Sequence, residues 1–165
     1  MAERFNVLFL CTGNSARSIL AEAAINHRSI GGGKFRGFSA GSHPAGQVHP
    51  LALEVLTAQH IPITGLRSKN WEEFASPRMP ELHFVFTVCD RAAAEVCPVW
   101  PGQPVTAHWG VPDPASAAGS EDQQRRAFRD AFLVLKRRIE LFAALPLDKL
   151  SEFALKERLD DIGRQ

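Results

Sequence analysis

The chain has 165 residues, 45 % of them hydrophobic and 22 % charged, which fits one globular domain and excludes a disordered or membrane-embedded protein. Its 19 basic and 18 acidic residues nearly cancel, so we expect no nucleic-acid partner and no membrane partner. The N-terminal stretch lacks the apolar run of a signal peptide, and three cysteines are an odd number for a disulfide framework. We therefore expect a cytoplasmic protein with free or catalytic thiols.

The first half of the chain alternates predicted strands and helices. Residues 5–10, FNVLFL, are apolar almost throughout, as in a parallel strand covered on both faces. Residues 18–29 have the apolar spacing of a helix, and a short strand is expected at 35–40. A second helix is expected over 49–60, with Pro50 in its first turn, where a missing N–H costs nothing.

The second half continues the alternation. Residues 82–89 repeat the pattern of an apolar strand that ends in cysteine, and a fourth strand is expected over 105–109. A long helix is expected over 120–145, with Ser120 as its N-cap. The basic side chains beside its apolar stripe predict a solvated face, or a docking surface for a reductase: Arg125, Arg126, Arg129, Lys136, Arg137 and Arg138.

These elements predict one α/β domain over residues 1–145, followed by a helical tail at 146–165. The sheet is expected to have four parallel strands flanked by helices. Ligands of such sheets bind beyond the carboxyl ends of the strands. The loops that follow 5–10, 82–89 and 105–109 are therefore the places to look for a site.

The stretch CTGNSARS places a thiol, a loop of small residues and an arginine directly after the first strand. Backbone N–H groups of such a loop can point at one centre, and the following helix adds its positive end. The guanidinium of Arg17 fits two oxygens of a tetrahedral oxyanion. The same field is expected to lower the pKa of Cys11 and hold it as a nucleophilic thiolate, with the Ser18 hydroxyl as a further donor. The expected oxyanion-binding residues are Thr12, Gly13, Asn14, Ser15, Ala16, Arg17 and Ser18. The alternative is a buried structural cysteine at a strand end.

The segment VLFLCTGNSARSILAEA resembles the signature of the low-molecular-weight protein tyrosine phosphatases, a family that includes the thioredoxin-coupled arsenate reductases. The resemblance covers about Phe5 to Leu145. It implies that Cys11 is the nucleophile, Arg17 the oxyanion binder and Asn14 an organiser of the loop. Many members have a second cysteine just before the arginine. Ala16 stands there in this chain, which excludes a disulfide within the loop.

Asp113, in the sequence VPDPA, matches the Asp-Pro motif that supplies the general acid of the phosphatases; alone it would be read as a turn residue. The tyrosine phosphatases usually follow this motif with aromatic residues. Here the sequence continues Ala-Ser-Ala-Ala, and the chain has no tyrosine. A small inorganic oxyanion fits this rim better than phosphotyrosine does.

Cys89 and Cys97 match the two redox cysteines of the arsenate reductases, although their gap of eight positions is one longer than in the best-known members. The resemblance implies a relay. Cys11 attacks arsenate, Cys89 resolves the adduct as a disulfide, and Cys97 takes over the disulfide for an external reductant. The segment between residues 90 and 104 must move in such a relay. Thioredoxin is the expected reductant, with glutathione and glutaredoxin as alternatives.

Two other functions stay open on the sequence: a phosphatase that acts through a cysteinyl-phosphate, and an oxyanion-binding or redox-sensing module without turnover. We expect no bound cofactor. Two structural thiols or a zinc site with His108 are alternatives for Cys89 and Cys97, but zinc ligands usually come as closer pairs.

A bound metal is also not expected. Glu22 and Ser39 stand where some relatives bind a monovalent cation, but Lys69 lies near the place of a further acidic ligand. Its ammonium group could substitute for the cation. His43 and His49 are expected to be exposed or capping residues, and the three tryptophans to pack in the core or at the rim of the site.

Overall fold

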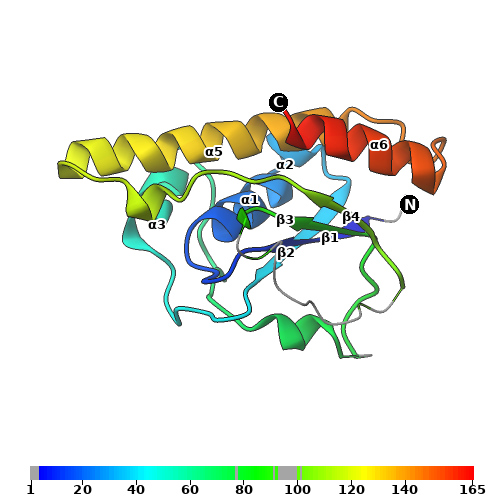
Figure 1. The fold of residues 1–165 in the computed structure, drawn as a ribbon, viewed down its shortest axis with the longest axis horizontal. Helices are drawn as coiled ribbons and strands as arrows, with labels where there is room; N and C mark the ends of the chain where they lie inside the picture. Colours follow the sequence, from blue (N-terminus) through cyan, green and yellow to red (C-terminus); the bar gives the residue numbers. More distant parts are fainter. Residues whose placement is uncertain (1–3, 77, 91, 93–99, 101) are drawn as a thin grey trace.

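The protein is described by a computed structural model that covers residues 4–76, 78–90, 92, 100 and 102–165. Its centre is a parallel sheet of β1 (Phe5–Leu10), β2 (Phe35–Ala40), β3 (Phe84–Thr87) and β4 (Val105–His108), in the order β2-β1-β3-β4 (Figure 1). This confirms the expected fold class. The carboxyl ends of β1 and β3 lie side by side, because Leu10 pairs with Thr87.

The helices follow the predicted positions with one difference. The structure has α1 (Arg17–Asn26), α2 (Arg28–Gly31), α3 (Pro50–Ala58), α5 (Glu121–Ala143) and α6 (Glu152–Gly163), and 3-10 turns η1 (Trp71–Phe74) and η2 (Pro114–Ser116). The helix expected over 18–29 is interrupted, because His27 has an extended backbone with ψ of 123°. Ser120 caps α5, as predicted, in a capping box with Gln123.

Alternate residues of β1 face two different cores. Val7 and Phe9 pack in the larger core under α1, α3 and α5, whereas Leu8 and Leu10 pack against Trp71 of η1 and its neighbours (Figure 1). β1 is therefore covered on both faces, which explains why its sequence is apolar almost throughout. The helices gather on one face, and η1 with irregular segments covers the other.

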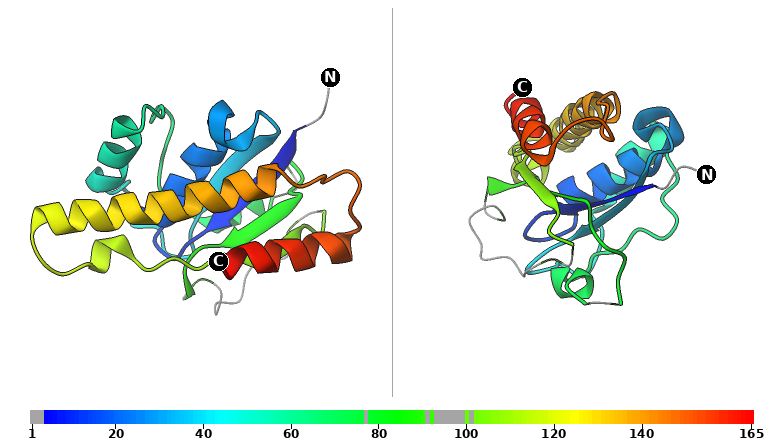
Figure 2. Two further views of the ribbon diagram at one scale, coloured as in Figure 1. Left: turned by 90° about the horizontal axis from the view of Figure 1, so that it is seen from above. Right: turned by 90° about the vertical axis from the view of Figure 1, so that its right-hand side faces the viewer.

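The tail folds back onto the domain. Helix α6 lies along the β4 edge of the sheet, next to the end of α5 (Figure 2), and buries Leu155, Leu159 and Ile162. The indole of Trp109, which is fully buried, donates from Nε1 to the Leu159 carbonyl at 2.9 Å. Trp109 is thus a core residue that ties the tail to the end of β4.

Among the helices of the described residues, none is both long and apolar enough to cross a bilayer.

Candidate functional site

The loop after β1 has its carbonyl groups bonded to a second loop. The carbonyl oxygens of Thr12, Gly13 and Ser15 accept hydrogen bonds from the backbone N–H groups of residues 43, 45 and 49, at 2.9, 2.9 and 2.8 Å. With these carbonyls engaged on one side, the loop N–H groups that are not bonded to Cys11 or Cys89 can serve an anion on the other. The loop also leads into α1, which has no side-chain cap and no acidic residue in its first turn. An anion at this helix end satisfies N–H groups that would otherwise lack partners.

Asn14 fixes the shape of this loop. Its backbone has a φ of 44°, in the left-handed region, and its side chain is fully buried. The amide nitrogen donates to the hydroxyl oxygens of Ser18 and Ser39, at 2.8 and 2.9 Å, and the amide oxygen accepts from the Lys69 backbone N–H at 2.8 Å. The Ser18 hydroxyl, expected beside the thiolate, is thus a partner of Asn14.

Gly41, just after β2, is a residue that the sequence reading missed. A Cβ atom there would collide with the carbonyl oxygens of Cys11 and Thr12, so only glycine allows the second loop to approach this closely. Gly13, inside the motif, has ordinary space for a Cβ, with Ser15 Oγ nearest at 3.8 Å. The sequence shows a glycine just after β2, but the atoms that require it belong to the loop after β1, about thirty residues earlier in the chain.

Arg17 reaches across the site to the loop after β4. Its Nη1 donates to the Val111 carbonyl at 2.9 Å, and its Nη2 lies 3.9 Å from Asp113 Oδ2. The Nε atom is buried and has no hydrogen-bond partner in the described part of the chain. Such an unpartnered donor beside an open helix end points to an anionic ligand.

Cys11 and Cys89 meet at the carboxyl ends of β1 and β3, as the sequence predicted. Both are buried free thiols, and each shifts the pKa of the other, so the two side chains are neighbours. Cys89 Sγ also accepts bonds from the backbone N–H groups of Thr12 and Ala92, at 3.4 and 3.3 Å, and lies 3.7 Å from Thr12 Oγ1. Cys97, the third cysteine of the expected relay, lies outside the described residues.

The charge of this pair differs from the expectation. The hydrogen bond from Cys11 and the two backbone N–H groups lower the pKa of Cys89 to about 5. The bond to Cys89, and then burial, raise the pKa of Cys11 well above its ordinary value. Arg17 and the Gly13 N–H act on Cys11 in the predicted direction but are outweighed. These pKa directions differ from the thiolate expected at Cys11, and the two thiols titrate as one coupled pair.

Asp113 is at once a turn residue and a neighbour of the site. It caps η2, where its Oδ1 accepts from the Ala115 N–H at 3.0 Å and its Oδ2 accepts from the Ser116 hydroxyl at 2.9 Å. The same Oδ2 faces Arg17. Its side chain is 39 % exposed, so solvent can exchange protons with it.

A hollow of about 570 Å³ opens over these groups. None of the residues that line it is aromatic, which fits the small-residue rim that the sequence indicated. The lining residues are Arg17, Cys89, Asp90, Gly110, Val111, Pro112 and Asp113.

Arg138 holds the wall of this hollow from behind. It is 7 % exposed, so its assignment to a solvated face of α5 is wrong. Its guanidinium donates to the carbonyl of Gly110 at 3.1 Å and to those of Gly163 and Gln165 at 3.2 and 3.1 Å. Burial lowers the pKa of Arg138. Arg138 thereby links the C-terminal end of α6 to Gly110. Gly110 directly precedes Val111, whose carbonyl accepts the hydrogen bond from Arg17.

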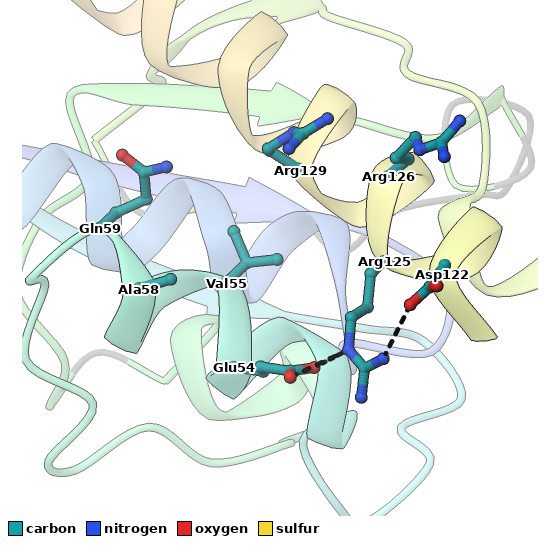
Figure 3. A pocket seen from close by; sticks show the side chains of 8 residues that line it. All are labelled: Glu54, Val55, Ala58, Gln59, Asp122, Arg125, Arg126 and Arg129. Carbon is teal, nitrogen blue, oxygen red and sulfur yellow. Dashed lines mark hydrogen bonds and ion pairs between the residues drawn. The ribbon is translucent and has the colours of Figure 1, made fainter.

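A second hollow, of about 350 Å³, lies between α3 and α5 (Figure 3). Arg125 is bonded there to Glu54 at 2.9 Å and to Asp122 at 3.4 Å, so its charge is compensated. None of the lining residues belongs to the loop after β1 or carries a nucleophile. They are Glu54, Val55, Ala58, Gln59, Asp122, Arg125, Arg126 and Arg129.

Two minor expectations can be compared with the structure. His49 caps α3, accepting from the Leu51 N–H at 3.1 Å, as predicted. Within the described residues, no three or more His, Cys, Asp or Glu side chains are grouped closely enough to hold a metal ion.

The fold and the site define a class of protein. They are typical of an enzyme that acts on a tetrahedral oxyanion through cysteine chemistry. The features are a cysteine just after a parallel strand, a loop of small residues, an arginine at the helix start and a second thiol next to the first.

The family follows from comparison with known proteins. Residues 6–152 match the model of the low molecular weight phosphotyrosine protein phosphatase family. The chain belongs to this family. Helix α6 lies almost wholly beyond the matched residues.

Its similar proteins include arsenate reductases. The arsenate reductase of Halalkalibacterium halodurans is 33 % identical over 137 residues, which are 83 % of this chain and 94 % of that protein. A solved arsenate reductase in an oxidized state is 27 % identical, covers 84 % of this chain and 96 % of the other, and has a TM-score of 0.66. The thioredoxin-dependent arsenate reductase of Corynebacterium glutamicum is 25 % identical with a TM-score of 0.55; the match covers 86 % of this chain and 64 % of that one.

Proposed function

We propose that this protein is an enzyme that reduces arsenate to arsenite through a cysteine relay. One observation carries the proposal: two free thiols, Cys11 and Cys89, are neighbours at the ends of β1 and β3, and Arg17, whose Nε has no hydrogen-bond partner among the described residues, lines the same hollow as Cys89. A phosphate monoesterase needs one thiol, whereas reduction of an oxyanion needs two that can form a disulfide. The relatives named arsenate reductase support the same function.

The oxyanion binds in the loop of residues 12–18. Its oxygens accept hydrogen bonds from the loop N–H groups and from Arg17, which stays anchored to the Val111 carbonyl. The absence of aromatic side chains among the residues that line the hollow favours an ion of the size of arsenate over an aromatic ester. We assign oxyanion binding to Thr12, Gly13, Asn14, Ser15, Ala16, Arg17 and Ser18.

The first chemical step uses the proton shared by the two thiols. As the Cys11 sulfur forms a bond to arsenic, its proton passes to the Cys89 thiolate across their hydrogen bond. One arsenic–oxygen bond breaks, and that oxygen leaves as water after taking a proton supplied through Asp113. Cys89 therefore acts as a base toward Cys11 before it acts as a nucleophile.

The second step forms the disulfide. The Cys89 sulfur attacks the Cys11 sulfur and passes its proton to an arsenic-bound oxygen. The sulfur–arsenic bond breaks and its electron pair stays on arsenic. Arsenic(V) becomes arsenic(III), arsenite leaves, and the two thiols are oxidised to a disulfide. Cys97 then attacks the Cys89 sulfur, and Cys11 leaves as a thiolate.

An external dithiol protein reduces the Cys89–Cys97 disulfide, and we assign this role to thioredoxin. The thioredoxin dependence of the Corynebacterium glutamicum relative supports this choice over glutaredoxin. Thiols that must cycle between the reduced and oxidised states need a reducing compartment, so we place the protein in the cytoplasm.

The test is arsenate-dependent NADPH oxidation in the presence of thioredoxin and thioredoxin reductase, run beside hydrolysis of p-nitrophenyl phosphate. We expect turnover that requires arsenate and that is lost in Cys89→Ser and Cys97→Ser. Brisk ester hydrolysis without arsenate turnover would instead show a phosphatase and make Cys89 and Cys97 structural. Oxyanion binding without product in either assay would show a binding or sensing module.

A further inference from the structure

A buried lysine lies under the oxyanion loop and takes no part in the steps above. The side chain of Lys69 is 7 % exposed, and that of Glu22 beside it is 14 % exposed. A buried ammonium group is costly unless oxygen atoms replace its water shell.

Four oxygen atoms surround the Lys69 ammonium nitrogen. It lies 2.8 Å from the carbonyl oxygens of Ser39 and Arg67, 3.4 Å from Ser39 Oγ and 3.6 Å from Glu22 Oε1. Burial lowers the pKa of Lys69 and raises that of Glu22, while their mutual attraction opposes both shifts. Carbonyl, hydroxyl and carboxylate oxygens are also the ligands of hard monovalent and divalent cations.

The resemblance to cation-binding relatives implies an ion beside Glu22 and Ser39, and the residues present do not fit one. The Lys69 ammonium group occupies the position among these oxygens where the ion would bind. A metal cation there would be repelled by the ammonium group at close range, with no further negative charge to compensate it. The Glu22 carboxylate is already paired with Lys69 and accepts a bond from the Ser39 hydroxyl.

Lys69 is connected to the oxyanion loop in two ways. Its backbone N–H binds Asn14 Oδ1 at 2.8 Å. Its ammonium group holds Ser39, whose hydroxyl accepts from Asn14 Nδ2 at 2.9 Å. Asn14 is the residue of the loop with positive φ, so its side-chain bonds stabilise the loop conformation.

We propose that Lys69 is a positioning residue: its ammonium group takes the place of a monovalent cation and holds Ser39 and Asn14 so that the loop binds its oxyanion without added metal. The proposal rests on the proposed function only in requiring that this loop binds an oxyanion. It predicts that oxyanion binding does not depend on potassium, because the Lys69 ammonium group supplies the positive charge.

The test measures binding of inorganic phosphate by calorimetry in choline chloride and in potassium chloride of the same ionic strength. Phosphate is a tetrahedral oxyanion that the two thiols cannot reduce, so binding is separated from turnover. The wild-type protein is expected to bind equally in both salts. Lys69→Met is expected to bind at least about tenfold more weakly, because small displacements of a positioning loop have large effects.

Lys34→Met is the matched control, because Lys34 also donates to a carbonyl, that of Ala143, but on the exposed surface. It should bind phosphate like the wild type. In Lys69→Ala, ammonium chloride or potassium chloride should restore the affinity for phosphate, because ammonium and potassium ions can enter the space among the oxygens that Lys69 leaves. Choline is too large to do so and should restore none. A merely structural lysine would give no such rescue.

If Lys69→Ala does not fold, Lys69→Met combined with Glu22→Gln removes both charges together and is measured in its place, with the same expected loss of affinity. Unchanged phosphate binding in the Lys69 variants, or a wild-type protein that needs potassium, would overturn the proposal. Absence of phosphate binding in the wild-type protein would instead overturn the proposed function.

Discussion

The two sides of the site are built differently. On one side the oxyanion loop, residues 11–18, is a continuous stretch whose chemistry is visible in eight consecutive letters. On the other side Cys89 and Asp113 are separate in sequence, and their positions depend on β3, β4, α5 and α6. In the proposed mechanism the first side supplies Cys11 and the groups that bind the anion. The second side supplies Cys89, the acid Asp113 and the wall of the hollow, and its geometry depends on residues distant in sequence.

The largest effect is expected where the two sides meet, at Arg17. Arg17→Lys removes the planar fork that reaches both the oxyanion and the Val111 carbonyl. We expect kcat/KM for arsenate to fall about 10²- to 10³-fold, as for loss of a donor to developing charge. Steady-state kinetics measure kcat/KM for both variants, and Arg129→Lys, at an exposed position, is the control. A decrease of less than about threefold would mean that Arg17 does not hold the oxyanion.

Arg138 tests whether the second side is held by the tail. Arg138→Met leaves the carbonyls of Gly110, Gly163 and Gln165 without their charged donor. We expect a loss of about 2–4 kcal/mol in the free energy of unfolding, measured by urea denaturation. The neighbouring exposed Arg137→Met should change it by less than about 0.5 kcal/mol. Equal effects of the two substitutions would contradict the role of Arg138 as a brace.

Gly41 and Gly13 test how the first side is held. Gly41→Ala places a Cβ against two carbonyls of the oxyanion loop, and we expect it to destabilise the fold by about 1–3 kcal/mol. Gly13→Ala has room for its Cβ and should cost less than about 1 kcal/mol. Thermal unfolding of both variants compares them. A larger loss in Gly13→Ala would reverse the order that the packing predicts.

The last prediction concerns the pH dependence of the thiol pair. The pKa of Cys89 is lowered to about 5 from 9.0, so its contribution to stability is fully present above pH 9 and is lost as the pH falls through about 5. The raised pKa of Cys11 acts in the opposite sense, and its contribution is lost as the pH rises above 9.

The ultraviolet absorbance of thiolates in the Cys97→Ser protein measures the titration of Cys11 and Cys89 directly. One thiolate should form near pH 5, well below the ordinary cysteine range. In Cys97→Ser with Cys11→Ser, Cys89 loses the sulfur donor that lowers its pKa most, so its titration should move toward higher pH. A first thiolate that appears only near pH 9 would show that the two thiols do not share a proton.

The comparison of the two sides also explains what the sequence could predict. β1, the loop and α1 are contiguous, so apolar runs, small residues and a helix start were enough to place Cys11 and Arg17. The parallel order of the strands also placed Cys89 beside Cys11. The coupling of the two thiols was not predicted, because it depends on N–H groups of Thr12 and Ala92 that reach Cys89 only in the fold.

Arg138 shows the other limit of sequence reading. Its place in a run of basic residues indicates a solvated face, although its position three residues after Leu135 puts it on the apolar stripe of α5, unlike the exposed Arg137. Only the return of α6 to the end of β4 buries it against the carbonyls of Gly110, Gly163 and Gln165. Gly41 was missed because the atoms that exclude a side chain there, the carbonyl oxygens of Cys11 and Thr12, belong to the loop after β1, distant in sequence.

The most direct test of the account is a single turnover without any external reductant. Reduced Cys97→Ser protein is mixed with excess arsenate and examined by mass spectrometry and arsenite assay. The account predicts one Cys11–Cys89 disulfide and one arsenite per protein molecule, and neither product in Cys89→Ser. Arsenite without this disulfide, or folded wild-type protein that binds arsenate and leaves both thiols reduced, would contradict the joint action of Cys11 and Cys89.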